Sequence, residues 1–443
     1  MKIQLSEHFS YSKLIRFTLP SIVMMIFTSI YGVVDGIFVS NYVGKTPFAA
    51  LNLIMPFLML FSAIGFMIGA GGSALISKTL GEGDRDRANS LFSMLIYVTA
   101  LLGAASAALG LIFLRPVSRL LGAEGEMLDY CVEYGRWILP ALPAFMLQST
   151  FQSLMITAEK PQMGLWVTVA AGLTNMVLDA IFVAAFRWGL LGAALATSMS
   201  QLVGGMIPFF YFFSRKNNSL LRLGRCSFDG PALLKTCTNG SSELMTNVSL
   251  SLVNMLYNFQ LMRFAGEDGV AAYGVIMYAN FIFISIYIGY SIGTAPIIGY
   301  HYGARNRDEL HSLYQKSLRL LAVTSLVLTV LGVALARPLS SIFVSYDPDL
   351  HAMTGRGFAL YALSFLLMGV NIFASSFFTA LNNGLVSAVI SFLRTLLFQL
   401  AAVLILPELL GLDGIWLAVV AAELMSLVVS VFFFRRMRPG YGY

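Results

Sequence analysis

The chain has 443 residues, of which 58% are hydrophobic and 11% are charged, and its mean hydropathy is +0.78. Charged residues make up about 25% of ordinary soluble domains, so this composition excludes a soluble globular protein and indicates an integral membrane protein. The formal charge of +6 is dispersed among short connections between apolar runs, which excludes a basic surface for nucleic acid.

Apolar runs recur along the whole chain, and each is longer than the stretch of about 18 residues that can cross a bilayer. We predict an all-α protein with twelve transmembrane helices, over 14–41, 48–78, 91–114, 131–157, 161–186, 189–214, 233–263, 270–301, 313–336, 356–380, 385–407 and 412–434. Most Lys and Arg residues lie in connections on the same side of the membrane as the N-terminus. The positive-inside rule therefore predicts a multi-pass protein of the plasma (cytoplasmic) membrane with both termini in the cytoplasm.

The first of these runs contains an aspartate, in the stretch YGVVDGIF at 31–38. An ionised carboxylate in hydrocarbon costs at least about 2.5–3.5 kcal/mol, so Asp35 is a candidate functional residue. The fifth run carries Asp179 at a comparable depth, with Asn175 one turn away on the same face, and Thr197 of the sixth run lies near that level. Two carboxylates in one poorly hydrated cavity cannot both ionise at low cost. We expect this cluster to load H+ or Na+, and structural hydrogen bonds are the alternative.

The seventh run carries four polar residues in a line, namely Glu243, Asn247, Asn254 and Asn258. At about 100° per residue, their spacing keeps all four within about 60° of one helical face. Such a stripe either joins helices or lines a water-filled passage. We favour a passage, in which Glu243 meets a cationic substrate or a proton.

Two opposite charges reach the middle of the eleventh and twelfth runs, as Arg394 and Glu423. Because an unpaired charge at that depth is costly, we predict a structural ion pair between these helices. Methionines and aromatic rings suit promiscuous apolar binding. The candidate walls of a substrate cavity are Met24, Phe27, Tyr31, Met55, Tyr257 and Met277. The three cysteines lack motif spacing, so no disulfide framework is expected.

The second half of the chain repeats landmarks of the first half at a constant offset of 222 residues. Among the matched positions are Gly81 with Gly303, Arg115-Pro116 with Arg337-Pro338, and Thr157 with Thr379. We therefore predict a duplicated six-helix unit, with lobes over 1–215 and 230–443 and a cytoplasmic linker over 216–229. Six spans per half make the repeats parallel, an arrangement that secondary transporters use for alternating access.

The motifs of common enzymes are not found in this sequence. Neither a G-x-x-x-x-G-K-[ST] nucleotide loop nor a His/Glu metal spacing occurs. We therefore expect no catalytic residue and no cofactor, and no metal beyond Na+ carried at Asp35 and Asp179. An ion gradient is then the default energy source. Two complete lobes in one chain predict a functional monomer in the lipid bilayer.

Four stretches together resemble the multidrug and toxic compound extrusion (MATE) transporters of bacteria. They are FTLPSIVMMIFTSIYGVVDGIFVSNYVG (17–44), GLTNMVLDAIFV (172–183), LGEGDRDRA (80–88) and YGARNRDEL (302–310). The resemblance covers essentially the whole chain and implies a V-shaped pair of lobes. It also implies that the ion-coupling network of the N-terminal lobe comprises Asp35, Asn175, Asp179 and Thr197. Gln152 occupies a polar place on the fourth helix where family members carry Asn.

The expected function is a cation-coupled antiporter that uses H+ or Na+ to export amphipathic, often cationic drugs or toxic compounds by alternating access. A lipid-linked precursor flippase or a metabolite exporter on a similar scaffold is the alternative. A flippase needs a strongly cationic cavity for pyrophosphate, whereas the spans supply chiefly acids and, as a base, only Arg394. A sensor would need a soluble signalling domain, and the sequence contains neither such a domain nor a loop long enough to hold one. A channel would be recognised by a flux of substrate that is not coupled to an ion gradient.

Overall fold

A computed structural model describes residues 3–345 and 347–443 of the chain. Helices joined by short connections account for nearly all of the described residues, and no strand is found among them. The helices are α1 (Tyr11–Tyr42), α2 (Lys45–Gly81), α3 (Arg85–Leu120), α4 (Gly125–Ile138), η1 (Leu139–Ala141), α5 (Leu142–Thr157), α6 (Pro161–Leu178), η2 (Asp179–Ala185), α7 (Gly189–Phe213), α8 (Gly230–Gly303), α9 (Arg307–Val344), α10 (Pro348–Ala362), α11 (Phe365–Ala380), α12 (Gly384–Phe392), η3 (Leu393–Leu397), α13 (Phe398–Leu410) and α14 (Leu412–Tyr441). η1 is a 3-10 turn, and η2 and η3 are π-helical segments.

Every apolar run predicted from the sequence is helical in the structure. Nine helices in the described part of the chain are long and apolar enough to cross a membrane, or ten when the bent pair of α10 and α11 counts as one span. α8 covers both the seventh and the eighth run, and it is broken at Gly266, whose φ of 64° and ψ of −150° are not helical. The fourth run is divided among α4, η1 and α5, because Pro140 and Pro143 interrupt it.

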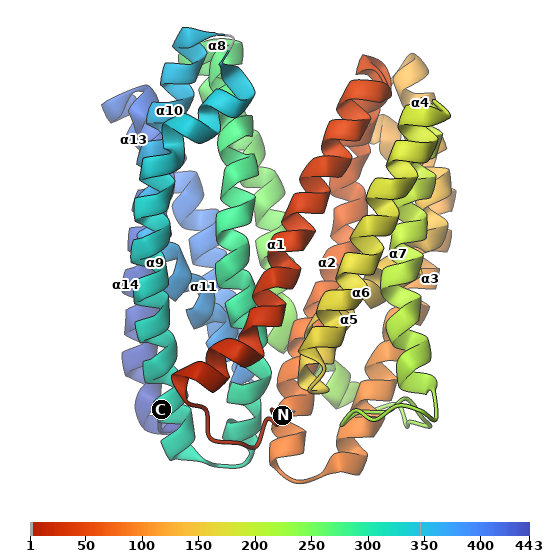
Figure 1. Ribbon diagram of the computed structural model, residues 1–443, viewed down its shortest axis with the longest axis vertical. Helices are drawn as coiled ribbons and strands as arrows, with labels where there is room; N and C mark the ends of the chain where they lie inside the picture. Colours follow the sequence, from red (N-terminus) through yellow and green to blue (C-terminus); the bar gives the residue numbers. More distant parts are fainter. Residues whose placement is uncertain (1–2, 346) are drawn as a thin grey trace.

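The helices form two groups that diverge like the arms of a V (Figure 1). The N-terminal group contains α2–α7 and the C-terminal group contains α8–α14, and both chain termini lie at the end where the groups meet. We call this end the closed end and the opposite end the open end. α1 runs obliquely between the groups and packs against both α6 and α8. The V-shaped, all-helical fold expected from the sequence is therefore confirmed.

The 222-residue offset reappears in the local structure of the two groups. Asp84 caps α3 by accepting a hydrogen bond from the Arg87 N–H (2.9 Å), and Asn306 caps α9 by accepting one from the Glu309 N–H (3.1 Å). Asn306 lies 222 residues after Asp84, and Glu309 lies 222 residues after Arg87. Such side chains satisfy a backbone N–H that has no partner within the helix. The two halves therefore begin their third helix in the same way.

At the closed end, glycines related by the same offset bring α2 and α8 into backbone contact. A Cβ on Gly81 would overlap the carbonyl oxygen of Tyr300, and a Cβ on Gly303 would overlap the carbonyl oxygen of Lys78. Small residues permit this close approach of two helices in a membrane protein. We call these two reciprocal contacts the glycine seam.

Gly81→Ala and Gly303→Ala are each expected to lower the unfolding temperature of the protein. The added methyl group must push two backbones apart, and overpacking of this kind costs about 1–3 kcal/mol. Gly224→Ala is the matched control, because nothing lies within 4 Å of the Cβ that it would add. Thermal unfolding of detergent-purified protein measures the effect. Unchanged unfolding temperatures in both seam variants would contradict this account of the closed end.

The segment before α1 joins the two groups at the closed end. The Leu5 N–H donates a hydrogen bond to Glu159 Oε1 (2.8 Å) of the N-terminal group. The Phe9 N–H donates one to Glu309 Oε1 (2.8 Å) at the start of α9. Both apolar side chains are fully buried. Residues 3–10 therefore lie across the boundary between the groups.

The connection between α7 and α8 is docked along α3. The Arg222 N–H donates to Asn89 Oδ1 (2.9 Å), and the Gly224 N–H donates to Ser93 Oγ (3.0 Å). This connection contains the predicted linker, 216–229, and the structure gives it fixed partners on the N-terminal group. The division of the chain into lobes at these residues stays a prediction.

Candidate ion-coupling site

Asp35 and Asp179 meet where α1 packs against the junction of α6 and η2. Asp35 lies in the part of α1 toward the open end, and Asp179 is the first residue of the π-helical segment that continues α6. The side chains of Asp179 and Asn175 face the Asp35 carboxyl group. Asp179 and Asn175 are buried. π-helical turns within α-helices often occur at functional sites, and here the turn begins at the aspartate.

The two carboxyl groups lack ordinary partners. Asp35 Oδ1 and both carboxyl oxygens of Asp179 are buried and make no hydrogen bond of ordinary geometry with any described residue. Burying a charge without a partner is costly, and two facing carboxylates cannot both stay ionised without a compensating cation. The arrangement therefore suits a proton shared by the pair or a small cation bound to its oxygens.

Tyrosine and threonine side chains complete the surroundings of the aspartates. Tyr134 of α4 is buried (2% exposed), faces Thr197 of α7 and lies within electrostatic range of both aspartates. Tyr31 of α1 lies near Asp35. Tyr134 is missing from the sequence prediction, because a single tyrosine in an apolar run usually serves packing and has no distinctive spacing. Its only signal is a depth similar to that of the aspartates.

Gln152 lies on α5. Its side chain is 8% exposed, and its Oε1 atom has no hydrogen-bond partner among the described residues. The amide oxygens of Gln148 on the same helix and of Gln201 on α7 also lack a hydrogen-bond partner among the described residues. A part for Gln152 in ion coupling stays a prediction.

The predicted polar stripe occupies the first half of α8, where hydrogen bonds are found for the side chains of Asn247 and Asn254. Asn247 Nδ2 donates to the carbonyl oxygen of Glu243 (2.8 Å), one turn earlier. Asn254 Oδ1 accepts from the Tyr273 hydroxyl (2.8 Å). The Glu243 side chain is half-buried and Asn258 is exposed. A substrate passage along these four residues stays a prediction.

The side chains predicted as cavity walls lie in both groups and between α1 and α6. Phe27 and Tyr31 cover Gly172 of α6, and Met24 packs beside Gly164 of the same helix. Met55 packs against the apolar core of the N-terminal group, and Tyr257 and Met277 belong to the core of the C-terminal group. Met24 and Tyr257 are buried, so contact with a substrate requires a rearrangement. Their role as cavity walls stays a prediction.

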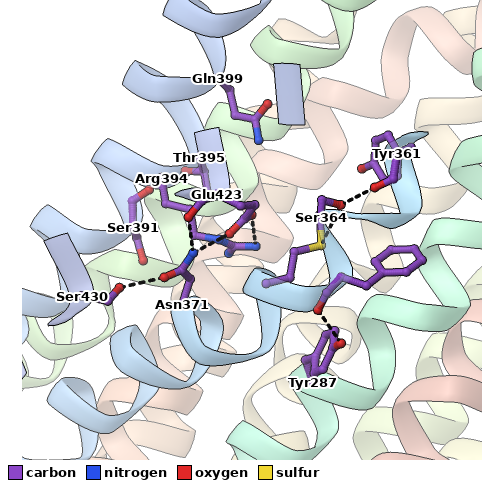
Figure 2. A network of polar contacts seen from close by, with 12 residues as sticks. Tyr287, Tyr361, Ser364, Asn371, Ser391, Arg394, Thr395, Gln399, Glu423 and Ser430 are labelled. Atoms are coloured by element: carbon purple, nitrogen blue, oxygen red, sulfur yellow. Dashed lines mark hydrogen bonds and ion pairs between the residues drawn. The ribbon is translucent and has the colours of Figure 1, made fainter. Parts of the chain in front are cut away.

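Arg394 and Glu423 form an ion pair inside the C-terminal group (Figure 2). Arg394 Nη2 lies 2.8 Å from Glu423 Oε1, and Arg394 Nε also donates to the carboxylate. Asn371 Nδ2 donates to Glu423 Oε2 (2.7 Å), and the Ser430 hydroxyl donates to Asn371 Oδ1 (3.0 Å). In contrast to the aspartate pair, this carboxylate has a complete set of partners, which is typical of a structural ion pair.

One residue of each centre, Asp179 and Arg394, lies in an equivalent helix of its half. Arg394 lies in η3, the π-helical segment between α12 and α13, as Asp179 lies in η2 after α6. Both segments fall within the fifth predicted span of their half. The duplicated scaffold thus carries a local widening of the helix at an ionisable residue on each side.

Among the described residues, no group of three or more His, Cys, Asp and Glu side chains could hold a metal ion. Neutral oxygen-bearing side chains near the pair include Asn175, which faces Asp35, and Thr197, which faces Tyr134.

The family model described as MatE matches residues 20–181 and 244–404, which together are more than half of the chain. The chain belongs to the MatE family. The two matched ranges follow one another at close to the 222-residue offset, so the family model recognises each half of this MatE protein separately.

Named relatives of this MatE protein are transporters. The multidrug export protein MepA of Staphylococcus haemolyticus is 23% identical over 432 residues, which cover 97% of this chain and 94% of the relative. An FAD transporter of Shewanella oneidensis is 23% identical over 432 residues, which cover 96% of this chain and 94% of the relative. A multidrug resistance MATE family transporter, solved in an outward-facing conformation, matches with a TM-score of 0.92 and 22% identity over 98% of this chain and 97% of the other. The last match shows the shared fold.

Proposed function

We propose that this MatE transporter is a cation-coupled antiporter that exports amphipathic, often cationic compounds in exchange for H+ or Na+. The observation that carries the proposal is the pair of Asp35 and Asp179, whose carboxyl groups face each other with three buried oxygens lacking partners among the described residues. Relatives named as multidrug export proteins support the export of drugs. The ion gradient across the membrane supplies the energy.

The proposed cycle couples the charge of this pair to the arrangement of the N-terminal helices. Binding of H+ or Na+ from the open end neutralises the carboxyl groups and rearranges α1 against α6, and this change expels the substrate outward. Release of the ion toward the closed end restores the charge and resets a cavity that accepts the next cation. The substrate drives this switch only through different affinities for the two states.

The proposal includes an orientation and a location. The closed end carries both termini and basic residues in or next to the connections, among them Arg85, Lys160 and Arg305. The positive-inside rule then places the closed end in the cytoplasm and the open end outside the plasma membrane. We further propose that one chain, with lobes over 1–215 and 230–443, transports as a monomer.

A metabolite exporter is the second candidate, because one relative of similar identity is named as an FAD transporter. A flavin dinucleotide carries a pyrophosphate, so its site calls for basic groups. The aspartates and Glu243 instead favour a cationic substrate. The two candidates therefore differ in the charge of the compound that they move.

Transport by purified protein in liposomes tests both candidates. Ethidium, a fluorescent organic cation, and FAD, which is also fluorescent, are offered separately under an imposed proton gradient or an imposed sodium gradient. We expect ethidium to move under one gradient, and FAD to move under neither. Movement of FAD alone would replace the drug exporter by the metabolite exporter, and movement of ethidium that ignores both gradients would contradict ion coupling.

A further inference from the structure

A cavity of about 680 Å³ lies at the closed end, far along α1 from the aspartates. α1 contributes Arg16 and Pro20 to its lining, the start of α6 contributes Lys160 and Trp166, and Tyr211 closes it from α7. It is thus built on the same two helices, α1 and α6, that carry Asp35 and Asp179. None of its lining residues belongs to the aspartate site.

Among the described residues that line this cavity, the charged side chains sum to one positive charge. Lys160 Nζ donates a hydrogen bond to Asn218 Oδ1 (2.7 Å), and the same oxygen accepts one from the Tyr211 hydroxyl (3.0 Å). Neither Lys160 nor Arg16 forms an ion pair with an acidic side chain of the described residues. Glu159 is the acidic residue among the described lining residues, and its Oε1 atom accepts a hydrogen bond from the Leu5 N–H (2.8 Å). A single phosphodiester balances this remaining charge.

The cavity lies at the depth where the apolar surface of the spans begins. Trp166, near the start of α6, is 68% exposed, and Ile15 and Leu19 on α1 are 45% and 50% exposed. Exposed tryptophan near the end of an apolar span is typical of the membrane interface. Basic groups and apolar walls thus meet at the level of the phospholipid headgroups, which distinguishes this cavity from a site for a water-soluble anion.

We propose that this cavity binds an anionic glycerophospholipid of the phosphatidylglycerol type. Arg16 and Lys160 donate charge-assisted hydrogen bonds to the phosphodiester, and an acyl chain lies along Trp166 and the exposed apolar side of α1. The bound headgroup bridges α1 to α6. Because Thr18 packs against Gly293 of α8 only two residues after Arg16, the lipid also fixes the part of α1 that meets the C-terminal group. It therefore stabilises the closed end.

Lipid titration of the detergent-purified full chain tests the proposal without relying on transport. Phosphatidylglycerol, phosphatidylcholine and inorganic phosphate are added separately, and native mass spectrometry and the unfolding temperature are the readouts. The variant Arg16→Gln/Lys160→Gln is compared with Arg87→Gln/Arg225→Gln, which removes two exposed charges elsewhere at the closed end. We expect phosphatidylglycerol to raise the unfolding temperature, and its affinity to fall about tenfold or more in the first variant only.

Equal affinity for phosphatidylglycerol in the wild type and the Arg16→Gln/Lys160→Gln variant would overturn the proposal. A stabilisation by inorganic phosphate equal to that by phosphatidylglycerol would overturn the assignment to a lipid. The variant Arg16→Lys/Lys160→Arg keeps both charges, so we expect it to retain binding; loss of binding in this variant as well would contradict a site defined by charge. Lipid binding is measured directly and does not depend on transport. A failure of the lipid proposal can therefore be distinguished from a failure of the proposed antiport.

Discussion

Asp35→Asn and Asp179→Asn are each expected to reduce gradient-driven export to the level of protein-free liposomes. Asparagine has nearly the shape of aspartate, but it neither takes up a proton near neutral pH nor carries the charge that holds Na+. The coupling step is therefore lost, although the substrate still meets the same helices. The measurement is ethidium transport by equal amounts of reconstituted protein under the gradient that drives the wild type.

The stability of the same variants separates coupling from a structural role. Because the carboxyl oxygens of Asp179 have no hydrogen-bond partner among the described residues, a neutral amide at this place is expected to leave the unfolding temperature unchanged or to raise it. Asp129→Asn is the matched control, since this aspartate is exposed and pairs with Arg115 at 3.2 Å. Wild-type export by both Asp35→Asn and Asp179→Asn would disprove the proposed coupling site.

Removal of either partner of the Arg394–Glu423 pair is expected to destabilise the C-terminal group by about 3–5 kcal/mol. Arg394→Leu leaves a carboxylate that is 2% exposed, and Glu423→Leu leaves a guanidinium that is 12% exposed. Each is then a buried charge without its opposite. The double variant Arg394→Leu/Glu423→Leu removes both charges, so we expect its unfolding temperature to lie above that of either single variant.

Thermal unfolding and ethidium export of these three variants distinguish the two roles of the pair. A structural pair predicts low unfolding temperatures in the single variants, with recovery in the double variant. The exposed pair Arg356–Asp413, whose closest atoms are 2.5 Å apart, supplies the control, because Asp413→Leu removes an ion pair that solvent already screens. Single variants with wild-type unfolding temperatures but no export would instead assign the pair to transport.

The helices could be predicted from the sequence because crossing a bilayer requires long apolar runs, and the offset between the halves could be predicted because the duplication has no gap. Breaks inside the runs were harder to predict. The break of α8 at Gly266 lies in the short charged connection between the seventh and eighth predicted runs, where Glu267 and Asp268 follow the glycine. The 48° bend between α10 and α11 instead lies inside the tenth predicted run, and no charge marks it. The oblique course of α1 depends on contacts with both groups, which no local pattern encodes.

The sequence predicts which residues of the candidate site lie at the same depth in the membrane. Asp35 and Asp179 have a calculable level in their spans, and so do Arg394 and Glu423. The rotation of each helix about its axis is set by packing and has no such signal in the sequence. For this reason Tyr134 was missed, and Met24 is packed against α6.

The glycine seam joins the two halves through two contacts that involve equivalent positions of the repeat. The contact of Gly81 with Tyr300 and that of Gly303 with Lys78 are related by the internal two-fold axis of the duplication. An opening motion that preserves that axis would separate both contacts by the same amount, so neither would persist when the other is lost. The proposed antiport cycle therefore predicts that the closed end opens in one cooperative step.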